Sequence, residues 1–162
     1  MLLASILRSK LRVMVMDPRP TSTTTSFAAS PKWIAMVRGQ SENNEAQAYA
    51  SNTGVGYFDT LFPGHYTDRA THTHLMAHIN GTEYTNGTFQ SSNIVHVGQV
   101  FYPMDLRDAV EASYPYNTNT QAVTTNDEDM WAPYEADNNY DPFPDYAYLG
   151  SDITDGLLVW IR

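Results

Sequence analysis

The sequence predicts an all-β fold, a sandwich or barrel-like sheet with long loops. After residue 31 the chain consists of short runs rich in Tyr, Phe, Val, Ile and Thr, separated by Gly, Pro, Asn and Asp, which is the pattern of short strands and turns. Only one short stretch has a helical pattern, and no internal repeat occurs. The 162 residues, 42% of them hydrophobic, suffice for one domain with its own core.

Four runs are strand candidates. The second ends at Asn80-Gly81, a dipeptide typical of hairpin turns, and the first is stopped by Pro63-Gly64. In chain order the candidates are "GVGYFDTLF" (54–62), "ATHTHLMAHI" (70–79), "SNIVHVGQVFY" (92–102) and "GLLVWI" (156–161).

One short helix is predicted between Asp105 and Ser113. Asp105 would cap its start, Pro115 would stop the chain from continuing it, and its apolar residues fall on one side: Leu106, Ala109 and Val110. We expect it to be a surface connection. Residues 117–144 are acidic and rich in Asn, Thr and Pro, which favours an ordered loop.

The first 40 residues differ from the rest of the chain. They hold six of the nine basic residues, and residues 17–30, "DPRPTSTTTSFAAS", have no apolar periodicity. We therefore predict that residues 1–40 are not part of the domain and that residues 41–162 form a partial β-sandwich. Basic residues interrupt the apolar start "MLLASILRSKLRVMVM", so no signal peptide is recognisable there.

Charge and composition narrow the classes of partner. Residues 41–162 carry 3 basic and 17 acidic side chains, a formal charge of -14. Such a surface repels phosphates and anionic lipids, so we expect neither nucleic acid nor membrane as partner. The absence of cysteine excludes disulfides and thiolate sites, whereas small substrates and a homo-oligomer remain open. Two glycosylation sequons, at Asn80 and Asn86, would suit a secreted protein.

Four of the five histidines lie between positions 65 and 78. On a strand, His72 and His74 would point to the same face, because side chains alternate. Two adjacent imidazoles can hold a metal ion, but they can equally form a solvated polar strand face. A cupin-like metal protein also uses His-x-His, yet that pattern needs a glutamate soon after, and Glu83 lies beyond the predicted turn.

Two neighbours favour a metal site. Tyr66 precedes His72 by six residues, and a phenolate oxygen is a hard anionic donor that suits ferric iron. Arg69 would hold an anionic substrate, or it would form a surface ion pair with Asp59 or Asp68. Only three basic residues follow position 40, which makes an arginine at this place notable.

Taken together, "FPGHYTDRATHTHLMAH" and "HVGQVF" resemble the intradiol ring-cleavage dioxygenases, in particular their secreted fungal branch. The hallmark is a tyrosine, then Arg-x-x-His-x-His, then a glutamine on the next strand. The resemblance runs from about Thr53 to Ile161. It implies an intradiol-dioxygenase-like β-sandwich and a secreted, extracellular protein.

The resemblance also implies a set of site residues. Tyr66, His72 and His74 match three of the family's four ligands to non-haem Fe(III), and Arg69 and Gln99 match its active-site arginine and glutamine. Tyr66 would also be catalytic, because the matching tyrosine leaves the metal and accepts a proton as substrate arrives. The implied reaction is cleavage of a catechol-type aromatic diol by dioxygen to a cis,cis-muconate-type diacid. The other histidines are expected to serve packing.

The family's fourth ligand has no match here. It is a tyrosine several dozen residues before the second one, and residues 1–48 contain no tyrosine. Tyr49 and Tyr57 are the only tyrosines before Tyr66. We therefore expect an incomplete domain. The alternative function is a truncated or non-catalytic relic of this fold that lacks the first tyrosine ligand.

Overall fold

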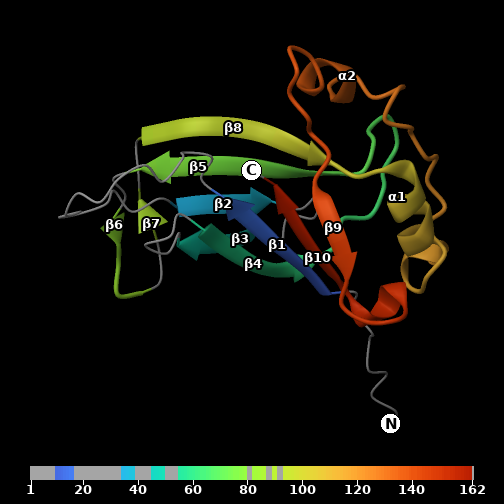
Figure 1. The fold of residues 1–162 in the computed structure, drawn as a ribbon, viewed down its shortest axis with the longest axis horizontal. Coiled ribbons are helices and arrows are strands. Elements are labelled where there is room, and N and C mark those ends of the chain that lie inside the picture. Colours follow the sequence, from blue (N-terminus) through green and yellow to red (C-terminus); the bar gives the residue numbers. More distant parts are fainter. Residues whose placement is uncertain are drawn as a thin grey trace, which may run out of the picture.

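The computed structural model describes residues 10–16, 34–38, 45–49, 55–79, 82–86, 89–90 and 93–161. These residues form two four-stranded sheets and a short two-stranded hairpin, with two short α-helices beside them (Figure 1). The predicted all-β sandwich with long loops is confirmed. In the part of the chain that the structure describes, no helix is long and apolar enough to cross a membrane.

The first sheet has the strand order β4-β1-β10-β9. β1 pairs in parallel with β10 and antiparallel with β4, so it lies inside the sheet with both edges bonded. The strands span Lys10–Met16 (β1), Val55–Leu61 (β4), Asp145–Tyr148 (β9) and Leu157–Ile161 (β10).

The second sheet has the order β3-β2-β5-β8, and all its pairs are antiparallel. A register shift between Ala77 and His78 interrupts the β5–β8 pairing. The strands span Ile34–Arg38 (β2), Glu45–Tyr49 (β3), His72–Ile79 (β5) and Asn93–Phe101 (β8). The separate hairpin pairs β6 (Thr82–Glu83) with β7 (Phe89–Gln90).

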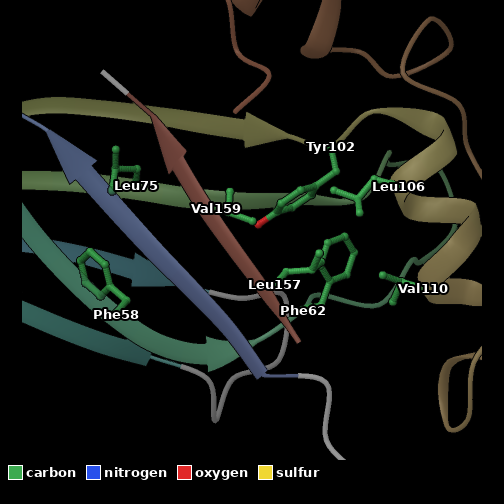
Figure 2. Packing of buried hydrophobic residues seen from close by; sticks show 8 residues of the cluster. All are labelled: Phe58, Phe62, Leu75, Tyr102, Leu106, Val110, Leu157 and Val159. Atoms are coloured by element: carbon green, nitrogen blue, oxygen red, sulfur yellow. The ribbon is translucent and has the colours of Figure 1, made fainter. Parts of the chain in front are cut away.

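The core joins the two sheets and one helix (Figure 2). Phe58 of β4 and Leu75 of β5 come from opposite sheets, and Tyr102 follows β8. Thr73, two residues before Leu75, bonds the Tyr102 hydroxyl through its Oγ1 at 2.7 Å. Because strand side chains alternate, inward Thr73 and Leu75 leave the intervening β5 positions on the opposite face of the sheet. The remaining members of the cluster are Phe62, Leu106, Val110, Leu157 and Val159.

All four predicted strands are present as β4, β5, β8 and β10. The predicted helix is α1, Met104–Glu111, but Pro103 is its N-cap rather than Asp105. α1 is not a mere surface connection, because Leu106 and Val110 are fully buried in the core. The predicted loop is mostly irregular, with a 3-10 turn at Tyr116–Thr118 and the helix α2 at Ala132–Glu135. A further 3-10 turn, Ile153–Asp155, precedes β10.

The predicted domain boundary at residue 40 does not agree with the strands before it. β1 lies inside the first sheet, and β2 pairs with both β3 and β5 in the second. The basic residues of β1 and β2 obscured their β pattern, in which apolar Val, Ile and Met dominate. For positions 1–9, 17–33 and 39–40, which lie outside the described residues, the boundary stays a prediction. The Asn80-Gly81 turn also lies outside them.

Candidate active site

Two histidines of β5 face each other on the sheet surface opposite the core. The Nε2 atoms of His72 and His74 are 3.2 Å apart, and their rings are steeply inclined. His72 is 0% exposed, whereas His74 reaches solvent. His72 Nδ1 lies 2.7 Å from the Ala70 carbonyl oxygen. A carbonyl oxygen can only accept, so Nδ1 carries the proton and Nε2 presents its lone pair.

The protonation state of His72 suits a ligand. Burial lowers its pKa to about 4, against the opposing effect of the Ala70 hydrogen bond. The ring is therefore neutral at pH 7. Two nitrogen ligands, each about 2.1 Å from one ion at a near-right angle, lie about 3 Å apart. The observed 3.2 Å between the Nε2 atoms, which is also the length of a hydrogen bond between the two rings, fits that arrangement.

A tight turn places Tyr66 beside the histidines. Tyr66 and Arg69 form an isolated antiparallel bridge, and Asp68 between them has φ 69°. Aspartate tolerates this left-handed conformation better than most residues. The half-buried Tyr66 ring has its centroid 6.2 Å from that of His72. The structure thus brings the three predicted ligands together.

A set of three metal donors at this place would need the phenol oxygen of Tyr66. Among the described residues, no group of three or more His, Cys, Asp and Glu side chains could hold a metal ion. A third donor beside the histidine pair would have to be another residue type, and the candidate is the Tyr66 phenol, whose ring centroid lies 6.2 Å from that of His72. Of the two tyrosines considered for the fourth position, Tyr57 belongs to β4 in the opposite sheet and Tyr49 to β3.

Arg69 and Gln99 also meet. Gln99 on β8 is the register partner of His74, and its Oε1 accepts a hydrogen bond of 2.5 Å from Arg69 Nη2. Arg69 Nε donates to Asp129 Oδ2 at 2.8 Å. The alternative sequence interpretation, a surface ion pair with Asp59 or Asp68, is wrong, because the partner of Arg69 is the buried Asp129.

Asp129 was not among the residues predicted from the sequence. It is 2% exposed and lies in the long loop before α2. Burial alone would raise its pKa, but hydrogen bonds from Arg69 and from the backbone of Trp131, Ala70 and Ala132 hold that pKa below its usual value. Asp129 is therefore charged at neutral pH. Many acidic residues surround it in sequence, so no local pattern sets it apart.

His65 anchors the turn that carries Tyr66. Its Nδ1 lies 2.7 Å from Glu111 Oε1 on α1, and its Nε2 lies 3.0 Å from the Gln121 carbonyl oxygen. The His65 carbonyl oxygen accepts from Asn119 Nδ2. The packing role expected for this histidine is what the contacts indicate. His78 is also buried, and His96 is exposed.

Comparison with known proteins identifies structures with a similar fold. No family model matches the chain, and no curated protein does. Among solved structures, an intradiol ring-cleavage dioxygenase from Tetranychus urticae is similar, with a TM-score of 0.68 and 17% identity over 95% of this chain and 78% of that one. The dioxygenase Tetur07g02040 is similar at a TM-score of 0.69 and 16% identity, over 98% and 81% of the two chains. The chain has the fold of these dioxygenases.

Proposed function

We propose that this chain is a non-haem Fe(III) intradiol dioxygenase that cleaves a catechol-type aromatic diol with dioxygen to a cis,cis-muconate-type diacid. The observation that carries the proposal is the pair of Nε2 atoms, 3.2 Å apart, beside a tyrosine and an anchored arginine. The fold of the similar dioxygenases supports it. Membership of the secreted fungal branch, and export, belong to the same proposal.

His72, His74 and Tyr66 would hold the iron. The neutral imidazole of His72 needs no deprotonation to bind, because burial already keeps the proton off its Nε2. Its Nδ1–H bond to Ala70 fixes the ring, as hydrogen bonds behind metal ligands generally do. Ferric iron bound there would withdraw electron density from the aromatic ring of the diol. It would thereby activate the ring for attack by dioxygen.

Arg69 and Gln99 would orient the substrate. Arg69 uses two of its five N–H donors, for Asp129 and Gln99, and the other three make no hydrogen bond within the described part of the chain. These donors are available for the negative charge that develops on the substrate oxygens. Because Gln99 Oε1 faces Arg69, its amide N–H groups remain as further donors.

Tyr66 would move a proton. A catechol that binds through both oxygens must release its hydroxyl protons, and a phenolate is a suitable acceptor. Tyr66 is half-buried, with its ring next to that of His72, so it can reach both the ligand pair and solvent. We propose that Tyr66 accepts one of the two protons.

Product analysis tests the reaction. Iron-loaded protein incubated with catechol and dioxygen should give the diacid cut between the two hydroxylated carbons. An extradiol semialdehyde as the product would reject the assignment. Isotope-labelled dioxygen should place one labelled oxygen on each new carboxyl group.

A second candidate function is the non-catalytic relic. It is favoured by the donor set, because the described strands β1 and β2, "KLRVMVM" and "IAMVR", contain no tyrosine and residues 1–48 have none. One phenolate in place of two leaves more net positive charge in a partly buried site, which weakens ferric binding. Iron binding without turnover, measured on the purified 162-residue chain, would favour the relic.

A further inference from the structure

We infer that Asp129 is a positioning residue of this site, which holds the Arg69 guanidinium in place and fixes the backbone that orients His72. The functional consequence rests on the proposed dioxygenase activity, whereas the structural statement does not. No motif pointed to Asp129. Its contacts define this role.

The two carboxylate oxygens of Asp129 face different parts of the molecule. Oδ1 accepts from the backbone N–H groups of Trp131 at 2.8 Å and Ala132 at 3.0 Å, and so holds the start of α2. Oδ2 accepts from Arg69 Nε and from the Ala70 N–H, both at 2.8 Å. Holding the start of α2 occupies only one of these oxygens. The second one bonds the turn that leads into β5.

Asp129 and Gln99 together fix the plane of the guanidinium. Asp129 binds Arg69 at Nε and Gln99 binds it at Nη2, from two different elements. A planar group held at two of its nitrogens cannot rotate about its last side-chain bonds. The directions of the remaining N–H donors are therefore fixed. A single hydrogen bond to Gln99 would not fix them.

Asp129 also supports the histidine pair through Ala70. Ala70 donates its N–H to Asp129, and its carbonyl oxygen accepts from His72 Nδ1 at 2.7 Å. Ala70 is 0% exposed and packs with Phe101 and Ala132. One buried residue thus connects the carboxylate to the ring of a proposed ligand. Moving the carboxylate would release both Arg69 and the backbone behind His72.

The decisive variant is Asp129→Asn, because an amide offers one acceptor oxygen instead of two. It can serve either α2 or the Arg69–Ala70 turn, but not both. The matched control is Glu128→Gln, the same change one residue earlier. Glu128 is exposed and its carboxylate bonds only Thr125 in the described structure. If circular dichroism shows Asp129→Asn to be unfolded, Asp129→Glu, which keeps the charge but displaces the carboxylate, takes its place.

The first measurement needs neither iron nor substrate. The Nε–H signal of Arg69, assigned by its loss in Arg69→Lys, is followed by nuclear magnetic resonance for exchange with water. A charge-assisted bond to a buried carboxylate protects this proton. We expect exchange to become about tenfold faster in Asp129→Asn and to stay unchanged in Glu128→Gln. Unchanged exchange in Asp129→Asn would overturn the positioning role.

The second measurement is anaerobic titration of the iron-loaded protein with catechol. Asp129→Asn should raise the Kd by about 10- to 100-fold, as loss of a supporting hydrogen bond typically does. In an Arg69→Ala background the same change should raise the Kd by less than it does in the parent, because only the route through Ala70 and His72 remains. Fully additive losses would show that Asp129 does not act through Arg69 and would overturn the inference. Failure of the parent to bind catechol would instead reject the proposed function, and the exchange rates would still decide whether Asp129 holds Arg69.

Discussion

At the scale of single residues, the proposed function depends on the two Nε2 atoms that face each other on β5. His72→Ala removes the buried one, and its loss should abolish iron binding and turnover together. Iron stoichiometry after reconstitution, measured beside diacid formation, checks this. His96→Ala, which removes an exposed histidine from the neighbouring strand, is the matched control and should retain iron. Full iron content in His72→Ala would contradict the proposed metal site.

Tyr66→Phe tests the phenolate donor. Tyrosinate bound to ferric iron gives a visible charge-transfer band, so the iron-loaded parent should be coloured and Tyr66→Phe should be colourless. The measurement is the absorption spectrum at equal iron content. A band that persists in Tyr66→Phe and disappears on further change of Tyr49 or Tyr57 to Phe would show a second tyrosine ligand.

Asp129 gives the protein a predictable pH dependence. Its folded pKa lies below the usual aspartate value, so its contribution to stability is fully present above that value and is lost as pH falls through the lower, folded pKa. The parent should therefore be more stable than Asp129→Asn at pH 7, and the difference in Tm should shrink below about pH 4. Thermal unfolding of both proteins from pH 7 to pH 3 measures it. A constant difference in Tm would contradict the assignment.

The sequence predicted the histidine pair because alternation along a strand is a local rule. His72 and His74 share a face whatever the rest of the chain does, and the turn at Pro63-Gly64 limits where Tyr66 can lie. Asp129 was not predictable, because its partner Arg69 is 60 residues away and the contact depends on how the loop packs. Its burial, which makes it important, is a property of the tertiary structure.

At the scale of elements, α1 and the end of β8 close the core against β5. The Tyr102 hydroxyl bonds Thr73 Oγ1 in a fully buried setting. Tyr102→Phe leaves the Thr73 hydroxyl without that partner, which should lower the free energy of unfolding by about 1–3 kcal/mol. Urea denaturation measures the loss.

The control for Tyr102→Phe is Tyr134→Phe on α2. Tyr134 is 75% exposed, so the same loss of a hydroxyl should change stability by less than about 0.5 kcal/mol. Equal stability of Tyr102→Phe and the parent would mean that the buried hydrogen bond contributes nothing net.

Element prediction succeeded where the local pattern agreed with the final environment. β4, β5, β8 and β10 carry aromatic and β-branched runs bounded by turn residues, and each was predicted close to its observed bounds. β1 was missed because Lys10 and Arg12 read as a basic segment, and its parallel pairing with β10 joins opposite ends of the chain. β9, "DYAY", has only four residues, too few for a pattern.

At the scale of the whole molecule, the uneven distribution of charge along the chain does not coincide with the division of the strands into sheets. The acidic residues gather after position 40, while the basic residues of β1 lie inside the first sheet. Arg69 is one of only three basic residues after position 40, and it is paired with a buried carboxylate. The Asp129 carboxylate offsets the charge of the Arg69 guanidinium, so this pair does not form a basic patch that would attract a large polyanion.

The place of β1 in the first sheet leads to a prediction for the whole chain. β1 bonds β4 on one side and β10 on the other, so deleting residues 1–16 separates them and leaves both edges unpaired. Unpaired edges and exposed apolar sheet surface promote association. We expect this deletion to abolish the cooperative unfolding transition, or to lower its midpoint by at least about 10 °C, and to give associated species in size-exclusion chromatography. Deleting only residues 1–9, which leaves β1 whole, is the matched control and should unfold like the parent. A monomeric protein with the parent's midpoint after removal of residues 1–16 would show that β1 adds nothing to the sheet and that the domain begins after it.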